Sequence, residues 1–374
     1  MAGYIMKRYG GLYEKIISFE NLYWASRSAR MGKKSKQSCA TFEMSVEDEL
    51  IALHKELHAK TYQPGSYREF TIYERKPRKI SAAPYRDRVV HHALCQVIEP
   101  IFERAFIHDS YACRPGKGTH RAVDRFTEFA RQNRYVLKTD IRKYFPSIDH
   151  EILFESIARK IKCRDTLGLI KLIIETSNPQ EEITTHYPGD DLFTPLEHRR
   201  GIPIGNLTSQ FFANIYLDGF DHYVKEILHC GAYIRYVDDI VVFDDNKKRL
   251  WAIRQAMEEY LSKLRLSLHP VKTIVVPVTE GVDHLGYRVF PDRRRLRKDN
   301  IVRFHRRIRK MQDDYTTGRV TLHDVNARVQ SWLGHAKHAD TYLLREKIFS
   351  SICFQRFLIP NMNLGNESNV QLTN

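Results

Sequence analysis

Long apolar runs are missing from this sequence of 374 residues. No stretch approaches the roughly 20 apolar residues that a membrane-spanning helix needs, and residues 1–8 lack the long apolar segment of a secretion signal. The six cysteines are scattered without a Cys-x-x-Cys pair, which indicates neither a zinc site nor a disulfide framework. We therefore expect a soluble, cytoplasmic protein with no membrane partner.

Acidic residues are also scarce in parts of the chain. Lysine and arginine together number 60 against 45 aspartates and glutamates, a formal net charge of +15. Between residues 293 and 310 the only acid is Asp299, and a second basic stretch covers residues 75–88. Two separate basic surfaces suit a long polyanion better than a small anionic metabolite.

The hydrophobic periodicity predicts an α+β fold, in which short strands carry acids and helices pack behind them. The helices are expected at 11–60 (two, the second introduced by Ser45), 87–102, 121–131, 150–162, 205–225, 247–264 and 293–314. The strands are expected at 70–73, 135–140, 233–243 (two), 271–278 and 284–290. An exposed loop is expected at 186–201, and a disordered polar tail at 361–374.

Acidic side chains interrupt two of the apolar strands. Asp140 ends the strand at 135–140, and the pair Asp238 and Asp239 separates two apolar runs within 233–243. Burying a carboxylate costs on the order of several kcal/mol unless a cation or hydrogen bonds compensate. A solvated turn would explain the aspartate pair alone, and a helix N-cap would explain Asp140 alone. The combination favours a metal site.

Magnesium suits such a site because it prefers oxygen ligands and commonly uses one or two carboxylates together with substrate phosphates. Two ions about 4 Å apart can activate an attacking hydroxyl and stabilise the leaving oxygen of a phosphoryl transfer. That reaction needs mainly positioning and charge neutralisation, so a few rigid carboxylates suffice. We therefore expect two Mg²⁺ ions as the cofactor.

Three motifs resemble those of reverse transcriptases. Tyr236-Val237-Asp238-Asp239 between apolar strands resembles the signature hairpin of that family, and Asp140 followed by Phe145 resembles its first catalytic motif. Residues 201–210, Gly-Ile-Pro-Ile-Gly-Asn-Leu-Thr-Ser-Gln, resemble the motif that lies between these two. The order and spacing match over residues 62–338. The resemblance implies an RNA-directed DNA polymerase, a nucleotidyltransferase with a right-hand fold of fingers, palm and helical thumb.

The resemblance also implies the roles of the residues at the catalytic centre. Asp140, Asp238 and Asp239 would bind the metal ions, helped by the backbone carbonyl of Ile141. Phe145 would press on the sugar of the incoming nucleotide and exclude a 2′-hydroxyl, so that the product is DNA. The alternative for Phe145 is an ordinary core aromatic.

Basic residues would contact the substrates. Arg78 or Lys79 would grip the deoxynucleoside triphosphate, and the sequence does not decide which of these two residues does so. The alternative is that this stretch is a solvated basic turn. Lys272 would protonate the leaving pyrophosphate, with a plain surface lysine as the alternative. A basic helix would open the thumb and cradle the RNA/DNA duplex through its phosphates. Its binding residues would be Arg293, Arg294, Arg295, Arg297, Lys298, Arg303, Arg306 and Arg307.

The domains implied are an N-terminal helical extension at 1–64, fingers at 65–134, a palm with part of the fingers at 135–290, and a thumb at 291–360. Residues 331–338 resemble a thumb segment of bacterial reverse transcriptases, where Trp332 is expected to pack in the core. Residues 284–287 resemble the turn that supports the primer end.

The middle motif departs from the common pattern of the family. Ile204 stands before Gly205 where most members carry glutamine, and Gln210 stands where most carry proline. Both changes resemble the reverse transcriptases of diversity-generating retroelements, which copy a template RNA and misread its adenines. Isoleucine cannot make the hydrogen bonds by which glutamine enforces pair geometry, and discrimination that depends on a polar contact is lost with it. The resemblance implies a template RNA and a basic helical accessory protein as partners.

Three other interpretations remain open. A group II intron enzyme would normally carry further maturase or endonuclease regions, and a retron enzyme should show recognition segments of its own. A non-catalytic RNA-binding scaffold with a polymerase fold would usually have lost one of the acids, whereas this chain has all three.

Overall fold

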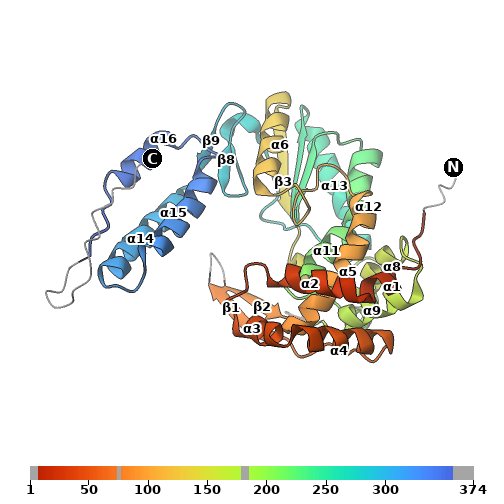
Figure 1. Ribbon diagram of the computed structural model, residues 1–374. Helices are drawn as coiled ribbons and strands as arrows, with labels where there is room; N and C mark the ends of the chain where they lie inside the picture. Colours follow the sequence, from red (N-terminus) through yellow and green to blue (C-terminus); the bar gives the residue numbers. More distant parts are fainter. Residues whose placement is uncertain (1–6, 74–76, 178–184, 357–374) are drawn as a thin grey trace, which may run out of the picture. The chain divides into compact units, whose positions relative to one another are not determined.

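The computed structural model describes residues 7–73, 77–177 and 185–356, so the expected tail at 361–374 lies outside the described residues (Figure 1). The fold is α+β, as predicted. The chain divides into two compact units. The first contains Met1–Gly118, Leu137–Val242 and Lys247–Val275. The second contains Thr119–Val136, Phe243–Asn246 and Val276–Asn374.

The N-terminal region forms four helices rather than the two predicted. They are α1 (Tyr13–Ile17), α2 (Phe19–Arg30), α3 (Gln37–Met44) and α4 (Val46–His58). Ser18 separates the first two because its hydroxyl accepts the Asn21 N–H at 3.3 Å and starts a new helix. Ser45 does precede α4, but its side chain makes no capping hydrogen bond. The prediction of a helix introduced by Ser45 is therefore right in position, although the serine does not act as a cap.

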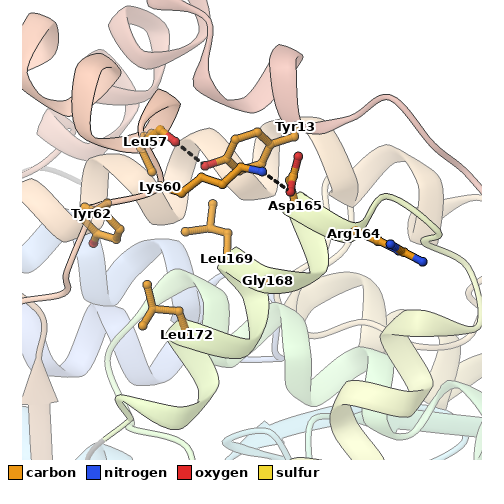
Figure 2. A pocket seen from close by; sticks show the side chains of 9 residues that line it. All are labelled: Tyr13, Leu57, Lys60, Tyr62, Arg164, Asp165, Gly168, Leu169 and Leu172. Carbon is orange, nitrogen blue, oxygen red and sulfur yellow. Dashed lines mark hydrogen bonds and ion pairs between the residues drawn. The ribbon is translucent and has the colours of Figure 1, made fainter.

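The N-terminal helical region and helix α9 (Arg164–Glu175) together line a small cavity of about 170 Å³ (Figure 2). The Tyr13 hydroxyl donates to the Leu57 carbonyl at 2.6 Å. Lys60 pairs with Asp165 at the first turn of α9 at 2.6 Å. The ion pair holds together segments that are 105 residues apart in the chain.

Helix α5 (Tyr85–Glu103) is the centre of the first unit. Its buried residues include Val89, Leu94, Ile98 and Phe102, and it packs against α2 and α11 (Leu207–Tyr216), as Figure 1 also shows. The expected single helix at 205–225 is divided into α11, α12 (Asp218–His222) and a π-helical turn at Tyr223–Ile227. Further helices are α7 (Tyr144–Ser147), α8 (His150–Ala158), α10 (Thr194–Glu197, inside the expected loop) and α13 (Lys247–Lys263).

A four-stranded sheet has the order β4-β5-β3-β6. Its strands are β3 (Tyr135–Asp140), β4 (Tyr233–Tyr236), β5 (Asp239–Asp244) and β6 (Ile274–Pro277). Strands β4 and β5 are antiparallel, with Tyr236 opposite Asp239, so Val237 and Asp238 form the connecting turn. The first unit contains an exposed hairpin of β1 (Arg68–Tyr73) and β2 (Pro77–Ala82). The strands predicted on both sides of the aspartate pair are confirmed.

The second unit contains helix α6 (Thr119–Gln132) and a small antiparallel sheet, followed by three helices. The sheet is formed by β7 (Val282–His284), β8 (Tyr287–Val289) and β9 (Arg294–Leu296), preceded by a 3-10 turn at Val278–Glu280. The helices are α14 (Lys298–Thr316), α15 (Leu322–Ala336) and α16 (Tyr342–Phe349). Trp332 is a core residue, as expected, and stacks on Phe304 with ring centroids 3.8 Å apart.

The helix predicted to begin near Arg293 is wrong at its start. Residues 294–296 form β9, which pairs with β8, and α14 begins only at Lys298. The reason is the position of Leu296, which is 6% exposed and faces the small core, whereas its neighbour Arg295 is exposed. This alternation is typical of a strand, but the run of charges conceals it. No helix in the described part of the chain is long and apolar enough to cross a membrane.

Candidate active site

The turn between β4 and β5 joins directly to the end of β3. The Ile141 N–H donates to the Asp238 carbonyl at 3.1 Å, so the residue after Asp140 is bonded to the aspartate pair. On the other side, the His269 N–H donates to the Asp140 carbonyl at 2.7 Å. Asp140 is 7% exposed. The structure therefore brings the three sequence-predicted acids together, although almost 100 residues of chain separate Asp140 from the other two.

The three carboxylates repel one another in a poorly solvated place. Burial, together with the neighbouring carboxylates of Asp140 and Asp239, raises the pKa of Asp238 to about 7. Burial also raises the pKa of Asp239, while Lys138 and Lys272 oppose that rise. Because the ionised carboxylates are destabilised here, a bound cation would stabilise them strongly.

Lys272 contacts this group of acids. Its ammonium pairs with Asp140 Oδ2. The segment that carries it is fixed by the Arg142 N–H, which donates to the Ser267 carbonyl at 2.9 Å, and by a hydroxyl contact of 2.7 Å between Thr139 and Thr273. The expected position of Lys272 beside the acids agrees with this contact. Its role as a proton donor stays a prediction.

A second group of possible metal ligands lies elsewhere in the first unit. Ligand atoms of Asp149, Glu151 and His198 all lie within 4.8 Å of one another, and among the described residues the acids at the β4–β5 turn do not gather that closely. However, Asp149 already caps α8, accepting the N–H groups of Glu151 at 3.0 Å and Ile152 at 3.1 Å, and it meets His198 at 2.6 Å. This group has a structural role that accounts for its geometry.

The acids at the turn fit magnesium better by their chemistry. Their donor atoms are carboxylate oxygens, without nitrogen or sulfur, and oxygen is the ligand that a hard cation prefers. A lysine ammonium in contact with one of the acids shows where positive charge is favoured.

The middle motif is bonded to the end of β2. The Ile204 carbonyl accepts the Ser81 N–H at 3.2 Å. Asn206 adds two bonds, from its Nδ2 to the Ser81 carbonyl at 3.2 Å and from the Ala83 N–H to its Oδ1 at 3.1 Å. Gly205 between them has φ +119°, and a Cβ there would lie 2.9 Å from Ile80 Cγ2. Only glycine fits this close approach.

The remaining predicted nucleotide-binding residues include one that joins the motifs. Phe145 lies half-buried in α7, and its carbonyl accepts the Ile202 N–H at 3.1 Å, which connects the first motif to the middle one. Gln210 is exposed on the first turn of α11. Arg78 and Lys79 are exposed on β2, where Lys79 pairs with Glu69 across the hairpin at 2.7 Å. The choice between Arg78 and Lys79 stays open.

The basic residues expected to bind the duplex fall into two groups. The first four lie around β9 and have partners within the protein: Arg293 bonds Asp292, Arg294 bonds Thr127 and Asp124, Arg295 lies over Phe290, and Arg297 pairs with Asp283 and Asp299. The second four, Lys298, Arg303, Arg306 and Arg307, are exposed on α14. Arg303 also pairs with Asp299, at 3.5 Å. Only the second group therefore lies on a basic helix, as predicted for all eight residues.

Two features of the site lie beyond the sequence-based prediction. Asn206, which bonds two backbone groups of the β2 region, stands out in the sequence only as part of a motif. Arg235 and Asp221 form a fully buried ion pair next to the aspartate turn. An arginine within an otherwise apolar strand is the available signal, because a buried charge almost always has a partner.

Comparison with known proteins identifies the class. Residues 68–289, more than half of the chain, match the family model described as reverse transcriptase (RNA-dependent DNA polymerase). Protein YkfC of Escherichia coli (strain K12) is 27% identical over 294 residues, covering 68% of this chain and 74% of that protein. Group II intron-encoded protein LtrA of Lactococcus lactis subsp. cremoris is 24% identical over 216 residues, covering 56% of this chain and 33% of LtrA.

A solved structure of apo telomerase from Candida tropicalis superposes with a TM-score of 0.44 at 14% identity, covering 64% of this chain and 49% of that one. A TM-score this low does not establish a common fold by itself, whereas the family match covers most of the catalytic region. The chain belongs to the reverse transcriptase family of RNA-directed DNA polymerases, whose fold is the right hand of fingers, palm and thumb. It has relatives of the group II intron type, and it matches only a third of the length of LtrA.

Proposed function

We propose that the protein copies a template RNA into DNA with two Mg²⁺ ions, and that it does so with errors at template adenines, as in diversity-generating retroelements. The observation that carries the polymerase part is the gathering of Asp140, Asp238 and Asp239 at the end of β3 and the β4–β5 turn. A cytoplasmic location and the predicted domain boundaries belong to the same proposal.

In this proposal the three aspartates and the Ile141 carbonyl hold the metal. When bound, the ions supply charge neutralisation for the triphosphate and activation of the primer hydroxyl. Lys272, already in contact with Asp140, delivers a proton to the leaving pyrophosphate. Phe145 excludes the 2′-hydroxyl of a ribonucleotide. Arg78 or Lys79 neutralises the phosphates from the β1–β2 hairpin.

The error-prone part depends on Ile204 and Gln210. Ile204 lies in the junction that connects the middle motif with β2, so its side chain is presented by a backbone that three hydrogen bonds hold. An apolar residue at this place leaves the base pair without a polar check on its geometry. The partners in this proposal are the template RNA, the RNA/DNA duplex, deoxynucleoside triphosphates and a basic helical accessory protein.

A second candidate is a group II intron-type enzyme, favoured by the similarity to LtrA. It would share the chemistry and differ in the RNA that it copies. Sequencing the RNA that is purified with the protein separates the two, because an intron RNA and a repeat-derived template differ in sequence.

Primer extension on a defined RNA, followed by sequencing of the cDNA, tests activity and error pattern together. We expect magnesium-dependent extension with mismatches concentrated at template adenines. Extension that persists in Asp238→Ala would contradict the catalytic assignment. Accurate copying by the wild-type enzyme would support the proposed polymerase activity and contradict the proposed errors at template adenines. Wild-type protein that binds RNA without extending a primer would favour the non-catalytic scaffold.

A further inference from the structure

Arg235 lies in β4, two residues before Val237 of the aspartate turn, and its side chain is completely buried. It forms a two-pronged ion pair with Asp221 of α12: Nε donates to Oδ1 at 2.7 Å, and Nη2 donates to Oδ2 at 2.6 Å. Asp221 is also fully buried. Such a pair is costly to desolvate and is often replaceable by apolar residues without loss of stability, so its presence calls for another reason.

The third nitrogen of Arg235 supplies that reason. Nη1 donates to the carbonyl of Val237 at 3.1 Å and to Oδ1 of Asn214 at 3.1 Å. Val237 has φ +58°, a left-handed conformation that a β-branched residue rarely adopts. The next carbonyl, that of Asp238, is held by the Ile141 N–H. Two successive carbonyls of a strained turn are therefore fixed from two sides.

Other contacts prevent Arg235 from moving. The Tyr233 hydroxyl donates to Asp221 Oδ1 at 2.6 Å, and Asn214 Nδ2 donates to the Ala112 carbonyl at 2.9 Å. The backbone of Arg235 is bonded as well, to the Asp109 carbonyl and from the Tyr111 N–H, both at 3.0 Å. The guanidinium is thus part of a rigid network, and the strained turn rests on it.

We propose that Arg235, anchored by Asp221, is a positioning residue that holds the strained Val237 turn so that Asp238 and Asp239 present their carboxylates to divalent cations. This inference rests on the proposed polymerase function and deepens it. It assigns the buried pair a task in preparing the metal site, in addition to any contribution to stability.

The test uses the full chain and the variant Arg235→Lys, which keeps the charge but loses the planar set of donors. Manganese binding is measured by electron paramagnetic resonance without nucleic acid, and hydrogen exchange is measured for the Ile141 amide. We expect manganese to bind about tenfold more weakly, since loss of the clamp lets the strained turn relax. The Ile141 amide, bonded to the Asp238 carbonyl, should lose protection at the same time.

Arg265→Lys is the matched control. Arg265 is 8% exposed and forms a two-pronged pair with Asp190 at 2.8 and 2.7 Å. It also pairs with Asp149 at 3.9 Å and lies over the ring of Tyr187, and none of these contacts joins its guanidinium to the aspartate turn. The control should lower the melting temperature to a similar degree and leave manganese affinity and Ile141 exchange within about twofold of wild type. A general loss of stability would instead affect both variants equally.

A second test asks whether Val237→Gly restores manganese binding in the Arg235→Lys variant. Glycine adopts a left-handed φ without strain, so Val237→Gly reduces the need for the clamp. The double variant Arg235→Lys/Val237→Gly should bind manganese about threefold more tightly than Arg235→Lys alone. Val237→Gly in the wild-type background should change manganese affinity by less than about twofold. A structural role of Arg235 alone predicts no such interaction between the two sites.

The outcomes separate the inference from the function on which it rests. If Asp238→Ala binds manganese as wild type does and wild type extends no primer, the proposed function fails. If wild type is active but Arg235→Lys matches the Arg265→Lys control in manganese affinity, the positioning role is overturned. Should Arg235→Lys fail to fold, Asp221→Asn, which keeps the shape and removes the anchoring charge, takes its place. The same measurements then decide, and wild-type manganese affinity in that variant overturns the positioning role.

Discussion

The aspartate turn and the basic segment at 293–310 use charge in opposite ways. At the turn, Asp140 is buried and Asp238 and Asp239 are half-buried, and burial with mutual repulsion raises the pKa of Asp238 to about 7. In the basic segment most charges are exposed, and those around β9 are paired with acids or rings nearby. A buried charge is expensive, so its position is specific, whereas an exposed charge tolerates change. Single substitutions should therefore have large effects at the turn and small ones in the basic segment.

The largest effect is expected from Asp140→Asn. Replacing the charged ligand with an amide should reduce primer extension in magnesium on the order of a thousandfold or more, because the acids act as a unit. The measurement is single-turnover extension of a labelled primer.

The matched control is Asp149→Asn, which lies in the group with His198 and Glu151. Asparagine also caps helices well, so we expect only a modest change in melting temperature and no change in rate. A rate that falls with Asp149→Asn and not with Asp140→Asn would transfer the metal site to that second group.

The next effect concerns the junction between the middle motif and β2. Gly205→Ala should lower the catalytic efficiency for nucleotide about ten- to a hundredfold, because φ +119° and the 2.9 Å approach to Ile80 force the junction to shift. Steady-state kinetics at varied nucleotide concentration measures it. The control is Gly168→Ala within α9, where a Cβ meets nothing within 4 Å. That change should stabilise the protein by about 0.5–1 kcal/mol and leave kinetics unaltered. Equal kinetics for both variants would show that the junction does not position the nucleotide.

Much of the aspartate site is predictable from the sequence, and the physical reason is local. Asp140, Asp238 and Asp239 stand out because acids rarely interrupt apolar strands, and the strands themselves follow from their alternation. The clamp by Arg235 is not predictable in the same way. Its partner Asp221 lies on helix α12, whereas Arg235 lies on strand β4, and no spacing rule reports which buried acid a buried arginine will meet.

In the basic segment the sequence predicts the wrong secondary structure. Ten basic residues among eighteen suggest one exposed helix, but Leu296 divides them into a strand and a helix. Charge composition does not distinguish these, because arginine tolerates both conformations when its side chain reaches solvent. The prediction for the N-terminal region fails for a related reason, since the short helix α1 ends at a serine whose capping bond depends on a neighbour's backbone.

A smaller effect is expected from Ile204→Gln. Restoring a side chain that can hydrogen-bond should lower misincorporation opposite template adenine about tenfold, while total extension changes little. Deep sequencing of cDNA from a defined template measures the error at each base. Leu207→Gln, three positions further on in α11, is the control and should leave the error pattern unchanged. Unchanged misincorporation in Ile204→Gln would remove the physical account of the error-prone proposal.

The smallest effect per residue is expected on α14. Arg306→Gln and Arg307→Gln remove exposed charges from the helix, and removing one phosphate contact should reduce the slope of log affinity against log salt by about 1. Affinity should fall to a similar extent for every duplex sequence, because phosphate contacts carry no sequence information. Filter binding of an RNA/DNA duplex across a salt series measures both quantities.

Arg294→Gln offers the comparison within the same basic segment. Arg294 bonds Asp124 and Thr127 inside the second unit, so its replacement should lower the melting temperature and leave the salt slope unchanged. The two α14 variants should reduce the salt slope and leave the melting temperature nearly unchanged, because exposed charges contribute little to the free energy of unfolding. If Arg294→Gln changes the slope as much as the α14 variants do, the division of the basic segment into a structural strand and a binding helix is wrong.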